Sequence, residues 1–417
     1  MRSDRHTTLV NLFKGGLPAL LSSVITALLP AAGILFLSTD SYAVWALAAT
    51  LTTIFLLIDF GTTSLATKLA AEQRLSGGAL GTLYALTTAP PLALTAITAA
   101  VWPTYARHAG LVDAQDPRAI VLIVLVGIGT ALRSFGLISA AVALGRRQFG
   151  RRGTVLLGGA LVQAVVTIGA LFAGVDFLAL GYGIVTAGIL QSVVGVLLAR
   201  PDLRADTSAS VWPLVRRFAS ARGVAVILGV TVTQLDRWSL GLFAGAAALT
   251  AYDLAIRFAT MPKIALLAFG SGLITEASGD VERTRLHSLY QRYSRLFAAL
   301  SALATLPVLV ITLVVASART PEPLSFIAPL AILAVVAHAV NAMTIPASFL
   351  TMGAGRPEVE LAYLAPLAVL CGIAYVLGNV TGSPLVQVAT WASAMVITSI
   401  SFIFWAPRFM KWTKNAG

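Results

Sequence analysis

Long apolar runs limit the fold of this chain more than any other feature of its sequence. Each run approaches the ~20 residues that a helix needs to cross the hydrocarbon core of a bilayer, and a bilayer excludes irregular backbone exposed to lipid. Because 58% of the 417 residues are hydrophobic and 11% are charged, a soluble fold is excluded. We predict an all-α polytopic membrane protein with twelve transmembrane helices, over about residues 16–37, 43–66, 78–102, 119–144, 154–173, 177–199, 223–244, 249–275, 296–318, 324–350, 361–378 and 385–406.

The basic residues between these runs predict how the helices are oriented. Of the 29 Lys and Arg residues, 22 fall in segments assigned to the inner side, three in outer segments and four within the membrane. The most basic short loop is GRRQFGRRG, at 145–153. The positive-inside rule therefore predicts that both termini lie in the cytoplasm. This distribution accounts for the net charge of +12 without nucleic acid, for which the sequence has no binding motif.

A weak internal repeat divides the chain into halves of six helices each. A shift of 207 residues places 36–47 on 243–254, at the first turn of each half. We predict an N-lobe over 1–199, a basic cytoplasmic or interfacial linker over 200–222 and a C-lobe over 223–417. Because six is even, the two lobes share their orientation, as in transporters built from parallel repeats, and we expect a substrate path between them.

Charged residues inside the second lobe's first two helices are candidate functional groups, because an ion in the bilayer core is costly and faces a partner or a water-filled path. Asp253 precedes Arg257 by four residues, so the two share a helix face and can pair. One interpretation is a structural charge cluster that locks the helix hairpin. In the other, Arg257, with Arg237 and Lys263, binds an anion in a cavity, while Asp236 or Asp253 tunes it.

Arg133 has no acidic neighbour within one turn of its predicted helix. It can form a buried pair with Asp59 inside the N-lobe. Alternatively, it lines the cavity as a bidentate ligand for an anionic group, a task that suits a planar guanidinium. The sequence leaves both interpretations open.

Coupling to an ion requires a group that changes its charge or that binds Na⁺. The candidates are Asp59, Asp236, Asp253 and His338, although a lone histidine in such a helix more often packs than titrates. The coupling ion would be H⁺ or Na⁺, and the sequence indicates no cofactor, no metal site and no catalytic residues. Its one cysteine, Cys371, excludes an internal disulfide. Four polar residues are candidates for binding an uncharged polar group: Gln163, Gln191, Gln234 and Asn341.

Two stretches carry a family resemblance, YAVWALAATLTTIFLLIDFG (42–61) and QLDRWSLGLFAGAAALTAYDLAIRFATMPK (234–263). They resemble the hallmark segments of polysaccharide flippases, which belong to the superfamily of MATE multidrug exporters and peptidoglycan lipid flippases. The resemblance implies a V-shaped pair of six-helix lobes in a bacterial-type plasma (inner) membrane. It also implies alternating access that moves a polyprenyl-diphosphate-linked oligosaccharide from the inner to the outer leaflet. The expected ligand of Arg133 and Arg257 is then the diphosphate, and the four polar residues become candidates for sugar recognition. Expected partners are this lipid-linked oligosaccharide and membrane lipids, with polysaccharide synthesis enzymes as candidates.

Two other functions compete with a flippase. A MATE-like exporter of cationic drugs would place mainly acidic groups in its cavity. The predicted helices instead hold four basic residues against three acidic ones, which favours an anionic substrate. A membrane glycosyltransferase or polymerase would need an exposed acidic catalytic loop, and the sequence has none. We therefore predict a transporter and not an enzyme.

Overall fold

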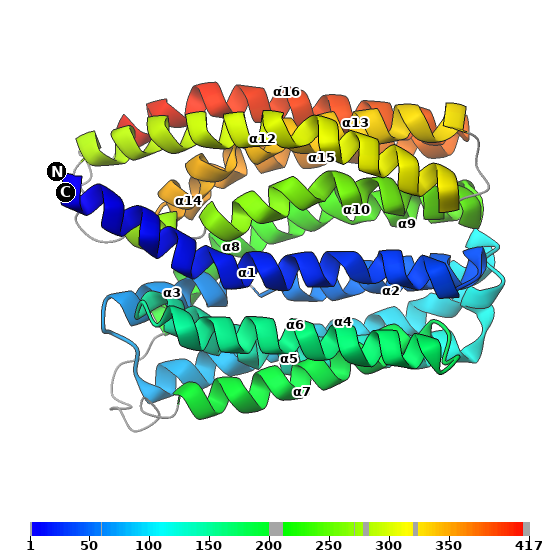
Figure 1. The fold of residues 1–417 in the computed structure, drawn as a ribbon, viewed down its shortest axis with the longest axis horizontal. Coiled ribbons are helices and arrows are strands. Elements are labelled where there is room, and N and C mark those ends of the chain that lie inside the picture. Colours follow the sequence, from blue (N-terminus) through cyan, green and yellow to red (C-terminus); the bar gives the residue numbers. More distant parts are fainter. Residues whose placement is uncertain are drawn as a thin grey trace. The chain divides into compact units, whose positions relative to one another are not determined.

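The computed structural model describes residues 2–59, 61–199, 212–270, 272–277, 283–319 and 324–411. These residues form helices joined by short turns, and no strand occurs among them. The helices, with the labels of Figure 1, are α1 (Arg2–Phe36), α2 (Thr39–Leu57), α3 (Thr62–Ala71), α4 (Gly77–Ala109), η1 (Asp113–Gln115), α5 (Pro117–Gly145), α6 (Phe149–Phe172), α7 (Leu178–Ala199), α8 (Trp212–Thr233), α9 (Leu235–Phe243), α10 (Gly245–Gly270), α11 (Leu273–Glu276), α12 (Arg283–Arg319), α13 (Leu324–Ala342), α14 (Ile345–Gly353), η3 (Pro357–Glu360), α15 (Leu361–Thr381) and α16 (Pro384–Lys411).

Every apolar run of the sequence falls on one or two of these helices, which confirms the all-helical prediction. Within the described residues, nine helices are long and apolar enough to cross a membrane. The predicted total of twelve is therefore not confirmed. The three runs outside this set are 43–66, 223–244 and 249–275. These are the runs in which the sequence places Asp59, Asp236 and Asp253.

Four predicted helices are interrupted, which corrects their assignment as continuous elements. In the run 249–275, α10 ends at Gly270 and α11 begins at Leu273. The run 43–66 divides into α2 and α3, and Gly61 between them has φ of 73°, a left-handed conformation that favours glycine. The run 223–244 divides into α8 and α9 around one residue. The run 324–350 divides into α13 and α14, where Pro346 in the first turn of α14 has no N–H to continue α13.

The chain divides into two compact units. The first-lobe unit comprises Leu21–Thr250, and the second-lobe unit comprises Met1–Leu20 with Ala251–Gly417. Helix α9 is held within the first-lobe unit by its Trp238. The indole Nε1 donates to Thr50 Oγ1 of α2 at 2.7 Å, and the Trp238 carbonyl accepts from the Tyr105 hydroxyl of α4 at 3.0 Å.

The predicted linker over 200–222 lies only partly within the described residues. Residues 200–211 lie outside them, whereas 212–222 form the first turns of α8. The units therefore divide within α10 and not at the linker, because α8 and α9 contact α2, α3 and α4. The N-lobe over 1–199 and the C-lobe over 223–417 remain predictions.

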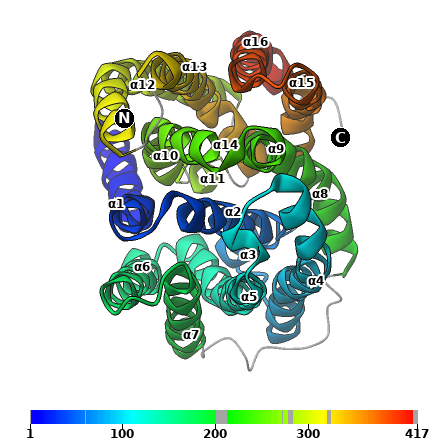
Figure 2. The same cartoon turned by 90° about the vertical axis from the view of Figure 1, so that its right-hand side faces the viewer.

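In the first-lobe unit, α5, α6 and α7 form a bundle and lie side by side in Figure 2. Helices α5 and α7 approach so closely that glycine is required at their contact. A Cβ on Gly129 would lie 2.7 Å from the Val185 nitrogen and 2.8 Å from the Ile184 carbonyl carbon, both backbone atoms. A Cβ on Gly136 would lie 2.8 Å from the Gln191 carbonyl oxygen. We call this contact the glycine seam.

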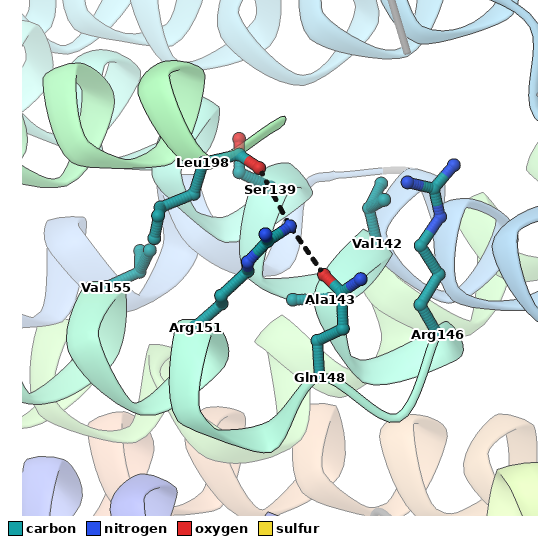
Figure 3. A pocket seen from close by; sticks show the side chains of 8 residues that line it. All are labelled: Ser139, Val142, Ala143, Arg146, Gln148, Arg151, Val155 and Leu198. Carbon is teal, nitrogen blue, oxygen red and sulfur yellow. Dashed lines mark hydrogen bonds between the residues drawn. The ribbon is translucent and has the colours of Figure 1, made fainter. Parts of the chain in front are cut away.

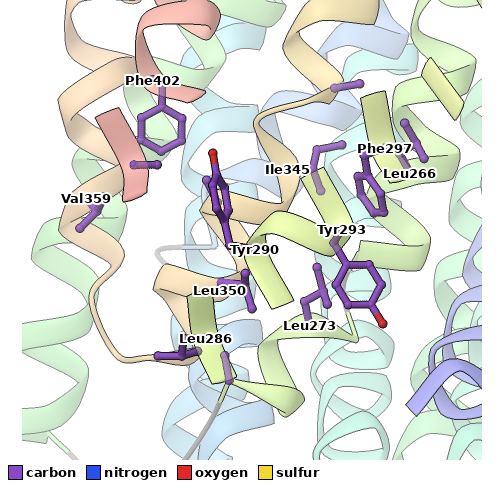
Figure 4. Packing of buried hydrophobic residues seen from close by; sticks show 14 residues of the cluster. Leu266, Leu273, Leu286, Tyr290, Tyr293, Phe297, Ile345, Leu350, Val359 and Phe402 are labelled. Atoms are coloured by element: carbon purple, nitrogen blue, oxygen red, sulfur yellow. The ribbon is translucent and has the colours of Figure 1, made fainter. Parts of the chain in front are cut away.

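The second-lobe unit has its own apolar core, shown in Figure 4. Leu286, Tyr290, Tyr293 and Phe297 of α12 are buried there, together with residues of α10, α11, α14 and α16. The Tyr290 hydroxyl donates to the Ile403 carbonyl of α16 at 2.8 Å, so the one polar atom of this ring is satisfied. Each unit thus has an independent hydrophobic core that supports its charged residues.

Candidate functional site

Arg133 lies in the middle of α5, where the side chain is half-buried. One guanidinium nitrogen donates to Gln163 Oε1 of α6 at 3.4 Å. Its Nε is buried and has no hydrogen-bond partner within the described residues, and no ion pair there involves this residue. Arg133 is therefore a cation in a membrane-spanning helix with a neutral partner and a spare donor.

The bundle around Arg133 contains further polar atoms without partners. Thr130 Oγ1 lies one turn before Arg133 on α5, and Thr167 Oγ1 lies one turn after Gln163 on α6. Gln191 of α7 donates through Nε2 to the Val155 carbonyl at 3.2 Å, but its Oε1 has no partner within the described residues. Buried polar atoms are normally satisfied, so a group of exceptions in one bundle indicates a place that binds water or a polar ligand.

Asp59 does not pair with Arg133, which corrects one of the two interpretations of that arginine. Its carboxylate lies in the turn between α2 and α3, where it accepts from the Gly61 nitrogen at 2.7 Å. It also accepts from the Thr63 nitrogen at 3.2 Å and from Thr63 Oγ1 at 2.5 Å. The carboxylate is held by the local turn because an interrupted helix leaves backbone N–H groups that need acceptors.

Asp236 and Arg237 are both buried at the start of α9. A guanidinium nitrogen of Arg237 lies 3.8 Å from Asp236 Oδ1. The same nitrogen donates to the Thr233 carbonyl at 3.2 Å and to Gln234 Oε1 at 3.4 Å. Arg237 therefore satisfies groups at the interruption between α8 and α9, and this geometry favours a structural contribution from it.

Asp253 and Arg257 form the pair within α10 that their spacing predicts. Arg257 Nε donates to Asp253 Oδ2 at 2.5 Å. The Asp253 side chain is fully buried, whereas the Arg257 side chain keeps 20% of its surface exposed. The pair neutralises a buried carboxylate and leaves part of the guanidinium accessible.

Lys263 and His338 complete the candidates from the sequence, and both belong to the second-lobe unit. Lys263 follows Pro262 in α10 and has no hydrogen bond or ion pair within the described residues, although Glu360 is near enough to act on its charge. His338 is buried in α13, with its ring 5.5 Å from that of Trp391 in a T-shaped contact. The packing of His338 against an aromatic ring resembles that of a core residue.

The four polar residues considered for sugar recognition have separate surroundings. Gln163 bonds Arg133, Gln191 packs in the glycine seam, and Gln234 bonds Arg237. Asn341 donates to Ser399 Oγ at 2.9 Å and to the Tyr363 hydroxyl at 3.4 Å. Sequence reasoning missed the threonine hydroxyls beside Arg133, because threonines in such helices usually bond a carbonyl one turn earlier and give no signal by themselves.

A pocket lies at one end of the α5–α6–α7 bundle (Figure 3). It is a small hollow that is partly open to solvent. Its lining residues are Ser139, Val142, Ala143, Arg146, Gln148, Arg151, Val155 and Leu198. None of the residues predicted as functional lies in this lining.

A comparison with protein families decides how the chain is classified. The family model described as "Polysaccharide biosynthesis protein" matches residues 35–321, which is well over half of the chain. The chain belongs to this polysaccharide biosynthesis family. No curated protein sequence gives a significant match.

This member of the polysaccharide biosynthesis family shares its fold with transporters. An outward-facing MATE family multidrug resistance transporter of the MOP superfamily has a TM-score of 0.73 at 14% identity, over 98% of this chain and 97% of that chain. A Vibrio cholerae MATE transporter in the bent form has a TM-score of 0.71 at 12% identity, over 97% and 98%. A MOP superfamily transporter from Pyrococcus furiosus, described as having a binding pocket of reverse polarity, has a TM-score of 0.68 at 13% identity, over 97% and 96%.

At these identities the structural likeness establishes the fold alone. The polysaccharide biosynthesis family member therefore has a MATE-like helical fold and is an integral membrane protein. Both findings agree with the resemblance seen in the two hallmark stretches.

Proposed function

We propose that this protein is a flippase that moves a polyprenyl-diphosphate-linked oligosaccharide from the inner to the outer leaflet of a bacterial plasma membrane. Membership of a polysaccharide biosynthesis family supports the glycan, and the MATE-like fold supports transport by alternating access. The two together favour a lipid-linked sugar over a soluble one, because a precursor made on one side of a membrane must cross it before it is used on the other.

The observation that carries the proposal is the environment of Arg133. Its guanidinium has a neutral partner in Gln163 and an Nε with no partner in the described residues. A cation kept in this state inside a bundle favours an anionic ligand, and a guanidinium presents paired donors that match phosphate oxygens. Arg133 is the residue that we assign to the diphosphate, with the hydroxyls of Thr130 and Thr167 as further donors.

The remaining cations have lesser roles in the proposal. Arg257 keeps partial exposure beside Asp253, and Lys263 has no ion-pair partner in the described residues, so both can attract the substrate's negative charge. Arg237 is engaged at the interruption of its helix and is assigned a structural role. Coupling to H⁺ or Na⁺ would use Asp236, Asp253 or His338, whose buried positions are suited to a change of charge.

The proposal is tested by lipid-linked oligosaccharide accumulation in cells depleted of the protein. Complementation uses wild type, Arg133→Ala and, as a matched control, Arg107→Ala at equal membrane abundance. Arg107 is exposed and bonds only the Pro103 carbonyl of its own helix. We expect depletion to trap the oligosaccharide on the inner leaflet, Arg107→Ala to relieve the block and Arg133→Ala to leave it in place.

The same cells separate a flippase from a drug exporter. If depletion leaves the lipid intermediates unchanged while efflux of a cationic dye falls, the polysaccharide substrate is wrong and a MATE-like exporter is correct. If Arg133→Ala clears the intermediates as wild type does, Arg133 does not bind the diphosphate.

A further inference from the structure

The pocket of Figure 3 lies where α5 and α7 end and α6 begins, in the basic segment Gly145–Gly153. Arg151 donates to Gln148 Oε1 at 3.0 Å and to the Leu198 carbonyl at 3.5 Å. Arg146 stands on the other side of Gln148 in Figure 3. The hollow is therefore flanked by two guanidinium groups, and no carboxylate lines it.

The backbone adds to the positive potential of this pocket. Helix α6 begins at Phe149, and its N-cap residue Gln148 makes no side-chain capping bond. A helix N-terminus carries a partial positive charge and exposes N–H groups that anions bind. Arg147 lies in the turn between α5 and α6, Arg152 lies in the first turn of α6, and the next acidic residue along the chain is Asp176. The pocket thus receives positive potential from two arginines and from the uncapped N-terminus of α6.

The pocket also lies at the boundary of the hydrocarbon region. Helix α7 is apolar enough to cross a membrane over Leu178–Leu198, and the last residue of this span, Leu198, lines the pocket. Exposed Ile189, Val193 and Leu197 recur every four residues along α7 and form an apolar stripe that ends beside the pocket. The basic pocket and the apolar stripe of α7 together match a molecule with a negatively charged headgroup and an apolar tail.

We propose that this pocket binds the phosphate of an anionic membrane phospholipid, with Arg146 and Arg151 as its ligands and the α7 stripe against its acyl chain. Basic pockets between membrane helices on the cytoplasmic side bind anionic headgroups in this way. The charge distribution of the sequence predicts that this segment faces the cytoplasm. Inorganic phosphate has the same charged group as the lipid headgroup, but it has no acyl chain to contact the apolar stripe of α7. The proposal is independent of the transported substrate.

The test measures lipid binding to the purified full-length protein. Retention of phosphatidylglycerol, phosphatidylcholine and inorganic phosphate is followed by native mass spectrometry, and the rise in Tm with each additive is recorded in parallel. Arg146→Gln and Arg151→Gln are compared with Arg147→Gln, a matched control that removes the same charge from the same segment without lining the pocket. Each arginine near an anionic surface contributes roughly 1 kcal/mol, which corresponds to about five-fold in affinity.

We expect Arg146→Gln and Arg151→Gln each to weaken phosphatidylglycerol retention about five-fold and Arg147→Gln to leave it unchanged. If Arg147→Gln weakens it equally, diffuse surface charge binds the lipid and the pocket does not. If inorganic phosphate raises Tm as much as phosphatidylglycerol does, the site takes a small anion and the lipid assignment is overturned. Arg151 also joins α6 to α7 through the Leu198 carbonyl, so the Arg151→Gln substitution removes a structural contact as well. If that variant does not fold, Arg146→Gln decides the test.

Discussion

Arg133 and Arg257 each carry a guanidinium group inside a helical bundle, but they differ in what they contact. Arg257 lies beside a fully buried carboxylate, whereas Arg133 has only an amide oxygen and keeps a buried Nε without a described partner. A buried charge with an ionic partner is a balanced arrangement, and one without it reduces stability. The two arginines should therefore respond in opposite ways to the same substitution.

Arg133→Met should leave the free energy of unfolding unchanged or raise it by about 1 to 3 kcal/mol, the usual cost of an unsatisfied buried polar group. Methionine keeps the unbranched stem and adds no polar atom. Thermal unfolding of the purified variant in detergent measures this effect, and the oligosaccharide accumulation assay should show loss of transport in the same variant. A fall in Tm would mean that Arg133 serves the fold and not the substrate.

Arg257→Met provides the comparison within the same protein. It removes the arginine partner of Asp253, whose side chain is fully buried, and breaking a buried pair in this way costs about 3 to 5 kcal/mol. The double variant Asp253→Asn/Arg257→Met should recover much of this loss, since no uncompensated carboxylate remains. Equal stability of the single and double variants would show that the pair contributes little.

At the scale of elements, the interrupted helices explain two groups of charges that sequence reasoning treated as candidates for transport. Asp59 satisfies N–H groups between α2 and α3, and Arg237 satisfies a carbonyl between α8 and α9. Interrupted backbone at membrane depth must be satisfied inside the protein. Hydropathy and charge located these residues, but they could not distinguish a charge that serves a broken helix from one that serves a ligand.

Asp59→Asn should therefore stay within ~0.5 kcal/mol of wild-type stability, whereas Asp59→Ala should lose about 1 kcal/mol, because asparagine and aspartate are comparable acceptors near helix starts. Transport by the asparagine variant, assayed by oligosaccharide accumulation, should match wild type. A stable asparagine variant that no longer transports would instead assign ion coupling to Asp59.

The glycine seam predicts a second effect at this scale. Gly129→Ala would place a methyl group 2.7 Å from the Val185 nitrogen, and overpacking of this kind costs about 1 to 3 kcal/mol. Gly169→Ala is the matched control, since nothing lies within 4 Å of its added Cβ on α6, and it should be neutral or stabilising by up to ~1 kcal/mol. Similar Tm values for the two variants would show that α5 and α7 are not in backbone contact.

At the scale of the whole molecule, the sequence predicted the fold class, the positions of the helices and the family, because apolar runs and two hallmark stretches determine them. It did not predict the interruptions at Gly61 and Gln234, since the conformations of these residues depend on packing. It identified Arg133 from its lack of an acidic neighbour in sequence. Its partner Gln163 comes from another helix, and single-sequence reasoning does not pair helices.

The orientation in the membrane remains a prediction that cysteine labelling can test. Cys371 is the one cysteine of the chain and is fully buried, so a membrane-impermeant maleimide should not label the folded wild type. Arg107→Cys and Arg147→Cys introduce thiols at exposed positions, in a Cys371→Ala background. The charge bias predicts labelling of position 107 in intact cells and of position 147 only after permeabilisation. The reverse pattern would contradict it.

The glycine seam also has a mechanical consequence. Side chains between two helices act as a compliant layer, and at this contact backbone lies directly against backbone. A displacement of α5 is therefore passed directly to α7, so the two helices move as one rigid body. Deformation must then concentrate at the weaker joints of the first-lobe unit, between α2 and α3 and between α8 and α9. Because Arg133 lies on α5, it would move with these two helices while its contacts within the bundle stayed fixed.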